Sequence, residues 1–280
     1  DGEYLFEKNI SLTKVLVSSF ERTKFKGQII FSSSIQENNE NPFGRSKKIC
    51  REHFKNWSIK NNGKFIGLII PNVFGPFGQP NYNSVIATFC DQLVKNTNPI
   101  IKIDARLNLI YIDDLISEII KIFNKDSKFS LNIKHTNKFH VSEILTLLNS
   151  FSKSYLEKNE IPNFSSKFEL NLFNTFRSYI DMKKHFPINY KNNEDSRGNF
   201  IELVRTRVGG QVSFSTTKPE ITRGNHFHTR KIERFSVIKG EALIELRKFN
   251  SNKILKYKLS GKKPSFIDMP IWYTHNIKNI

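Results

Sequence analysis

The pattern of the sequence changes near residue 190, and this change constrains the fold more than any other feature. Before it, short apolar strands such as Lys64–Ile70 alternate with amphipathic helical segments such as Asn9–Phe25. This alternation predicts a parallel sheet with helices on its faces. After it, short strand-like segments separated by glycines predict an antiparallel barrel or sandwich. The sequence therefore predicts two domains, residues 1–186 and residues 187–280.

The expected elements follow from periodicity and from turn residues. In the first part we expect helices at residues 9–25, 43–61, 84–95, 113–123, 141–156 and 167–184, and strands at residues 28–31, 64–70 and 107–112. In the second part we expect strands at residues 200–205, 211–215, 235–238, 242–246, 254–259 and 266–269. Asp113 is placed to cap the helix that follows it.

Three side chains in the second part are spaced like metal ligands. His226 and His228 leave the same face of a strand, and Glu233 follows after a short connection and can return on a neighbouring strand. His275 is available as a fourth ligand. Three imidazoles and one carboxylate suit zinc, nickel, iron or manganese. The alternative is a set of unrelated surface histidines, but the chain has only 7 histidines, which favours the metal site.

The charge of the chain raises the question of a nucleic-acid partner. The formal net charge is +18, but the 44 lysines and arginines are spread along the whole length, in no basic block or helix. They accompany abundant Asn, Ile and Phe, as expected of an AT-rich coding sequence. We therefore predict no nucleic-acid partner, although a basic surface favours anionic ligands such as nucleotide diphosphates.

The apolar runs and the cysteines of the sequence indicate where the chain is expected to reside. No apolar run approaches the ~20 residues that a membrane-spanning helix needs. Cys50 and Cys90 are too few and too unpatterned for a disulfide scaffold. The sequence therefore predicts a cytoplasmic protein without a membrane partner.

The metal spacing on a many-stranded β region resembles the cupin superfamily. The two cupin motifs match at His226, His228, Glu233 and Gly240, and at Pro270, His275 and Asn279. Two glycines of those motifs are replaced, by Glu220 and Trp272, and neither replacement removes a ligand. The resemblance implies a jelly-roll barrel that holds a metal ion.

Further candidates in this part concern the substrate. The segment Asp195–Glu202 resembles one in sugar-nucleotide cupins that act on deoxyhexoses, which implies a substrate contact for Arg197. Lys218 and Arg223 flank the first motif and could hold phosphate oxygens, the alternative for both being a solvated charge. Tyr273 stands beside His275 and is a candidate acid or base for proton transfer next to a ketone, the alternative being a packed aromatic.

The first part resembles the extended short-chain dehydrogenase/reductase family. The resemblance lies in Ser32–Ser34, Asn41–Lys47, Pro71–Gly75 and Tyr111–Leu115. It implies a Rossmann-like α/β domain that uses a nicotinamide cofactor. The roles it implies are catalytic for Ser34 and Lys47, cofactor-binding for Lys47 and Asn72, and substrate-binding for Arg106.

Two departures from that family bear on hydride chemistry. Phe43 occupies the tyrosine position, and a phenyl ring has no hydroxyl to donate a proton. No glycine-rich loop follows a first strand, so the phosphate cradle of a dinucleotide fold is not found in the sequence. We therefore expect an N-terminally incomplete Rossmann-like domain, a cupin domain shortened at its C-terminal end, and loss of the reduction step.

The order of these pieces resembles the bifunctional capsular-polysaccharide assembling enzymes of the CapF type over nearly the whole chain. The segments Ser32–Gln36, Pro80–Cys90 and Tyr273–Ile277 carry the match. The resemblance implies a homodimer whose cupin half epimerises a UDP-linked 4-keto-6-deoxy-N-acetylhexosamine at C3 and whose reductase half then reduces C4 with NADPH. It further implies zinc on the four metal ligands and substrate contacts from Asn81, Tyr82 and Asn83.

Two functions thus remain open at this point. One is a sugar-nucleotide epimerase of capsular or surface polysaccharide biosynthesis, whose surviving chemistry is the cupin step. The other is a non-catalytic, metal-stabilised module that binds sugar nucleotide or dimerises. Incorporation of solvent deuterium at C3 of the 4-keto sugar discriminates between them.

Overall fold

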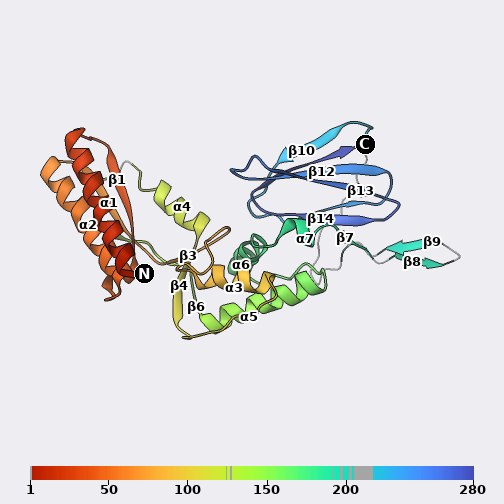
Figure 1. Ribbon diagram of the computed structural model, residues 1–280, viewed down its shortest axis with the longest axis horizontal. Helices are drawn as coiled ribbons and strands as arrows, with labels where there is room; N and C mark the ends of the chain where they lie inside the picture. The colour runs from red at the N-terminus through yellow and green to blue at the C-terminus, as the bar shows by residue number, and fades with distance from the viewer. Residues whose placement is uncertain are drawn as a thin grey trace. The chain divides into compact units, whose positions relative to one another are not determined.

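The computed structural model describes residues 2–123, 125–126, 128–190, 192–195, 198–201, 204 and 217–280 (Figure 1). Contacts divide the chain into two compact units, Asp1–Phe74 with Asp104–Val141, and Gly75–Ile103 with Ser142–Ile280. The predicted boundary between residues 186 and 187 stays a prediction. In the described ranges, no helix combines the length and the apolar character needed to cross a bilayer.

The first unit is a mixed α/β structure. Its elements are α1 (Gly2–Arg22), β1 (Gln28–Ser34), the 3-10 helix η1 (Ile35–Asn38), α2 (Pro42–Asn61), β2 (Lys64–Ile70), β3 (Asn72–Phe74), β4 (Arg106–Tyr111), α4 (Ile112–Ile120), β5 (Lys128–Asn132) and β6 (Asn137–His140). β2 pairs in parallel with β1 and β5, and β3 pairs in parallel with β4, to which β6 adds an antiparallel strand. The predicted parallel sheet is confirmed.

β2 forms the centre of this unit because both of its faces are covered. Ile66, Leu68 and Ile70 leave one face and pack with Ile110 of β4 and Leu115 of α4. The opposite face carries Phe65, whose ring lies 6.3 Å from that of Phe54 on α2. A strand buried on both faces is expected to be a continuous apolar run, as this one is.

Helix α2 begins at a defined cap and lies close to the chain before it. Asn41 accepts a hydrogen bond from the backbone N–H of Gly44 at 2.7 Å, and Pro42 occupies the first turn, where its missing N–H is not needed. A Cβ on Gly44 would come within 1.9 Å of the carbonyl oxygen of Gln36, so only glycine allows this approach. The helix start is thereby placed against η1.

A buried ion pair joins α2 to η1. The Arg51 guanidinium donates to both carboxylate oxygens of Glu37, through Nε and Nη2, each at 3.0 Å. Ser33 of β1 donates to the same carboxylate at 2.6 Å, and Arg51 also donates to the carbonyl of Phe129 on β5 at 2.8 Å. This network joins the strands β1 and β5 to the helices η1 and α2.

The second unit combines helices with antiparallel strands. Its helices are α3 (Val85–Val94), α5 (Val141–Phe151), the π-helical segment η2 (Ser152–Glu157), α6 (Lys167–Arg177) and α7 (Met182–His185). Its strands are β7 (Ile188–Asn189), β8 (Asn192–Asp195), β9 (Gly198–Ile201), β10 (Thr222–His226), β11 (Glu233–Val237), β12 (Glu241–Lys248), β13 (Ile254–Ser260), β14 (Ser265–Met269) and β15 (Tyr273–Asn279). The strands run β10–β15–β12–β13 in one sheet, β11–β14–β7 in a second, and β8–β9 as a pair.

The two larger sheets pack face to face on one apolar core. That core takes Ile244 and Leu246 from the first sheet and Val237 and Ile267 from the second. Met182 of α7 belongs to the same cluster. The prediction of an α/β region followed by an all-β region is confirmed, and β11 to β14 match the strands expected at residues 235–238, 242–246, 254–259 and 266–269. The strand expected at residues 211–215, and part of the one expected at residues 200–205, lie outside the described residues.

Three details of the helical predictions were wrong. The first helix begins at Gly2, and the helix expected at residues 167–184 is interrupted between α6 and α7, where Asp181 caps the second one. Asp113 is not a cap, because α4 begins at Ile112 and Asp113 lies inside its first turn. A carboxylate there is still stabilised by the positive end of the helix dipole.

Candidate metal centre

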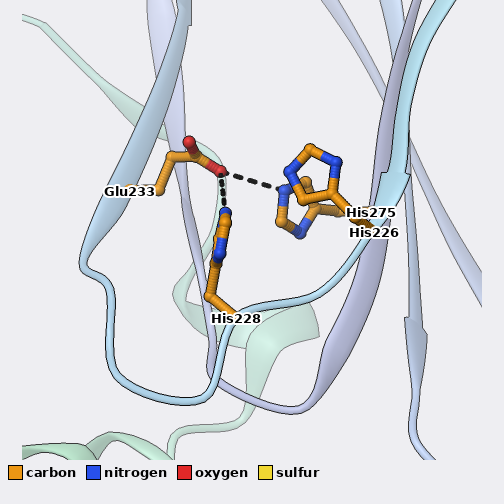
Figure 2. A group of neighbouring side chains, drawn as sticks. All are labelled: His226, His228, Glu233 and His275. Atoms are coloured by element: carbon orange, nitrogen blue, oxygen red, sulfur yellow. Dashed lines mark ion pairs between the residues drawn. The ribbon is translucent and has the colours of Figure 1, made fainter.

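Three histidines and one glutamate converge at one end of the two packed sheets of the second unit, which we call the β domain. One ligand atom from each of His226, His228, Glu233 and His275 lies within 4.8 Å of the others. Oε2 of Glu233 is 2.9 Å from Nε2 of His275 and 3.3 Å from Nε2 of His228. Figure 2 shows the four side chains turned toward one another. Two ligands of a tetrahedral zinc ion are separated by about 3.4 Å for bonds of 2.0–2.2 Å, so these distances suit a metal site.

The cluster bridges the two sheets. His226 ends β10 and lies in register with His275 on β15, in the four-stranded sheet. Glu233 opens β11, which pairs with β14 in the other sheet, so it does not return on a strand next to β10 as predicted. His228 lies in the connection between β10 and β11 rather than on a strand. The cluster therefore combines side chains from both sheets at this end.

The tautomer of His275 is set by its backbone. Nδ1 lies 3.1 Å from the carbonyl oxygen of Tyr273, which can only accept, so Nδ1 carries the hydrogen and Nε2 presents its lone pair to the cluster. Metal-binding histidines are commonly oriented in this way. Burial lowers the pKa of His275, which favours the neutral imidazole that binds metals.

The Glu233 side chain is held in its ionised form. Burial raises its pKa, but the hydrogen bond and positive charge of Lys231, together with His228 and His275, outweigh that effect, and the net pKa is lowered. Nζ of Lys231 donates to Oε1 at 2.5 Å, on the oxygen that does not face the histidines. Oε2 is therefore left as an anionic ligand atom.

The chemistry of this donor set fits a divalent cation. Nε2 of His228, Oε2 of Glu233 and Nε2 of His275 are shielded from solvent and make no hydrogen bond within the described part of the chain. Buried polar atoms without partners are rare and require an explanation. With the Nδ1 hydrogen on His275, two lone-pair atoms face each other across 2.9 Å, an arrangement that a bound cation stabilises.

Both glycine positions that the cupin motifs lack here keep a glycine-like backbone. Glu220 has φ +63° and Trp272 has φ +62°, in the left-handed region. Such a conformation is unfavourable for a non-glycine residue by about 1–2 kcal/mol. At Trp272, stacking of the indole on Phe227 at 5.5 Å and packing on Phe249 at 5.8 Å offset this strain. Trp272 therefore adopts the left-handed conformation that a glycine would favour at this turn.

The other predicted residues of the β domain lie at different places. Tyr273 lies two residues from His275, on the same face of β15, and packs against the core. Lys218 precedes β10 and Arg223 is near its start, so both lie toward the end of the strand opposite His226. Arg197 lies outside the described residues. The roles given to these residues stay predictions.

In the first unit, the reductase-like residues occupy the junction of β1, η1 and α2. Ser34 accepts a hydrogen bond from the backbone of Gln36 and caps η1. Nζ of Lys47 donates to the carbonyl of Ser32 at 3.0 Å and lies 5.7 Å from the ring centre of Phe43. Burial lowers the pKa of Lys47. Phe43 thus stands one helical turn before Lys47 and offers it a phenyl ring in place of a hydroxyl.

The remaining predicted contacts are divided between the two units. Asn72 on β3 donates to the carbonyl of Asn108 at 3.1 Å, and Arg106 is the exposed first residue of β4. Asn81–Asn83 belong to the second unit, in the exposed loop before α3. The roles predicted for all of these residues stay predictions.

Two features beside the cluster were missed from the sequence. Lys231 gave no signal, because one lysine near a turn resembles any solvated charge. The Asp268–Arg234 pair did give one, since Asp268 interrupts the apolar run Phe266–Met269. A charge at a core position of a strand requires a buried partner.

Comparisons with known proteins agree with this architecture. Residues 1–133 match the NAD dependent epimerase/dehydratase family, and residues 193–280 match the polysaccharide biosynthesis C-terminal domain. The UDP-2-acetamido-2,6-beta-L-arabino-hexul-4-ose reductase of Pseudomonas aeruginosa is 30% identical over 97% of this chain and 73% of its own length. CapF of Staphylococcus aureus is 34% identical, with a TM-score of 0.62 over 95% of this chain and 74% of its own. The chain belongs to the CapF family.

Two further comparisons add detail to the CapF assignment. A structure of CapF with the inhibitor 3-isopropenyl-tropolone is 32% identical, with a TM-score of 0.59 over 96% of this chain and 75% of its own. UDP-glucose 4-epimerase of Thermotoga maritima is 16% identical with a TM-score of 0.53 over 64% of this chain and 71% of its own, and supports the fold alone. The predicted CapF resemblance is confirmed.

Proposed function

We propose that the chain is a UDP-sugar-modifying enzyme of polysaccharide biosynthesis and that its cupin-like β domain epimerises a UDP-4-keto-6-deoxy-N-acetylhexosamine at C3. The cluster of three histidines and one glutamate carries the proposal. The relatives support the substrate class, because one of them is named as a reductase of a UDP-linked hexulose and one matching family is named for polysaccharide biosynthesis. The resemblance to CapF also supports a homodimer.

The four clustered side chains would hold the metal, for which we propose zinc. A divalent ion bound there polarises a neighbouring ketone and thereby acidifies the adjacent C–H bond. The inhibitor of the CapF relative supports a metal, because a tropolone offers two adjacent oxygens that suit a divalent cation. His275 and Glu233 are already in the protonation states that metal binding needs.

Proton transfer at C3 needs a base on one face of the sugar ring and an acid on the other. We propose Tyr273 as the proton donor. Burial, together with the nearby Asp181 carboxylate, raises the pKa of Tyr273, so its phenol carries a proton at neutral pH. Arg197, Lys218 and Arg223 are proposed as anion-binding side chains for the sugar nucleotide.

We propose that the reductase-like unit contacts a nicotinamide cofactor but does not reduce the sugar. Lys47 could contact a nicotinamide ribose, with Ser34, Asn72 and Arg106 as further contacts. The phenyl ring of Phe43 offers no hydrogen to transfer to a sugar oxygen, so these residues do not fit the proton-transfer step, and we derive no reduction at C4.

Deuterium exchange tests the proposed function. The zinc-loaded protein is incubated in D2O with UDP-4-keto-6-deoxy-N-acetylhexosamine, and C3 is followed by NMR, with NADPH absorbance recorded in parallel. We expect deuterium at C3 and no NADPH consumption, because only the β domain supplies its chemistry. Without exchange at C3 in a folded, zinc-loaded protein, the chain would be a binding or dimerisation module.

A further inference from the structure

A buried ion pair lies directly behind the metal-site carboxylate. Arg234 follows Glu233 on β11, and successive side chains of a strand leave opposite faces, so Arg234 points away from the metal cluster. It lies in register with Asp268 of β14, while Glu233 lies in register with Met269. Nε and Nη2 of Arg234 donate to the two oxygens of Asp268 at 2.7 and 3.0 Å. The pair therefore fixes the register of β11 at the residue next to Glu233.

Helical segments of the same unit contact Asp268 and its neighbour Met269. Tyr155 of η2 donates to Oδ2 of Asp268, and burial raises the pKa of Tyr155, so the phenol stays protonated and remains a donor. The Arg234 guanidinium lies 3.8 Å from the ring centre of Phe266. Arg177 of α6 donates to the carbonyl of Met269 at 2.8 Å. The C-terminal end of β14 is thus held by side chains of η2, α6 and β11.

This end of β14 is linked to all four metal ligands. Residues 270–272 connect it to β15, which carries His275. The backbone N–H of Trp272, within that connection, donates to the carbonyl of His228 at 3.0 Å. His226 is in register with His275, and Glu233 with Met269. A shift of β14 would therefore change the distances between Glu233 and the three histidines.

We propose that Asp268 is a positioning residue for the metal centre, acting through Arg234 and Tyr155 to fix Glu233 against His275. The inference rests on the proposed metal site and extends it to residues that touch no ligand atom. Asp268 is 2% exposed, so neutralising it leaves the guanidinium of Arg234 buried without its counter-ion. Residues that orient the ligands of a metal typically change its affinity by about 10–100-fold when they are replaced.

Cobalt titration of the full chain tests this inference. Co²⁺ alone is added to the metal-free wild type, Asp268→Asn and Tyr155→Phe, and the affinity and d–d absorption bands are recorded. We expect about 10–100-fold weaker binding and altered bands for Asp268→Asn, and a smaller change in the same direction for Tyr155→Phe. A purely structural role would lower stability and leave the bands unchanged.

Glu37→Gln is the matched control, because it weakens the buried Glu37–Arg51 pair of the first unit and should leave Co²⁺ binding unchanged. Wild-type affinity and bands in folded Asp268→Asn and Tyr155→Phe would overturn the inference. If Asp268→Asn does not fold, Tyr155→Phe and Arg234→Lys decide by the same criteria. If the wild type binds no Co²⁺, the proposed metal site is wrong. If the wild type and all variants bind Co²⁺ equally, the metal site stands and only the role of Asp268 is wrong.

Discussion

Replacing His275 with alanine is expected to lower zinc affinity by more than the ~10–100-fold typical of residues that only orient a ligand. His275 is the most buried of the four ligands, at 1% exposure, and its Nε2 is aimed at Glu233 by the hydrogen bond to the Tyr273 carbonyl. Competition with a zinc chelator measures the affinity, and elemental analysis of the purified protein measures the bound metal. C3 exchange should disappear together with the metal.

The same variant should lose the stabilisation that zinc gives. A ligand that binds only the folded state stabilises it by about 2.7 kcal/mol at a free concentration 100 times its Kd. The wild type should therefore melt at lower temperature in a chelator, and His275→Ala should melt at the same temperature with or without it. His53→Ala, outside the cluster, is the control and should behave as the wild type does. A His275→Ala protein with the full chelator sensitivity of the wild type would show that zinc binds elsewhere.

The clustering of His226, His228 and Glu233 could be predicted from the sequence because the signal is local. His226 and His228 are two residues apart, and the turn that returns the chain to Glu233 is short. His275 was only an available fourth ligand in the sequence, since 42 positions separate it from Glu233 and the β10–β15 register is what brings it to His226. The sheet to which Glu233 belongs depends on the pairing of β11 with β14. These two strands share an apolar core, and the spacing of the ligands does not indicate that pairing.

Helix ends and buried charges were harder to predict. The start of α3 was predicted to within one residue, at Ser84 for Val85, whereas Asp113 resembled a cap although β4 runs directly into α4 at Ile112. The Arg51–Glu37 and Arg234–Asp268 pairs join residues from different elements. Arg51, Glu37 and Arg234 each resemble a solvated side chain, and only the fold shows that they are buried. Asp268 alone is marked in the sequence, by the apolar run that it interrupts.

Replacing Arg51 with methionine is expected to lower the free energy of unfolding of the first unit by about 3–5 kcal/mol, the range for removing one partner of a buried ion pair. The side chains of Arg51 and Glu37 are 9% and 7% exposed, so the carboxylate left behind is desolvated and, within the described part of the chain, keeps the Ser33 hydroxyl as its one side-chain donor. The loss of the hydrogen bond from Arg51 to Phe129 adds to the effect because it frees β5 from α2.

The two tryptophans make this effect measurable for the first unit alone. Trp57 lies on α2 in the first unit and Trp272 in the second, so urea unfolding followed by fluorescence in a Trp272→Phe background reports the surroundings of Arg51. Arg45 lies on the same helix as Arg51, and Arg45→Met removes an exposed pair with Glu3 of α1, so it should change stability by only about 0–1 kcal/mol. Replacing both Arg51 and Glu37 with apolar residues should restore much of the loss, because no uncompensated charge then remains buried. Equal losses for Arg51→Met and Arg45→Met would show that burial does not set the strength of the Arg51–Glu37 pair.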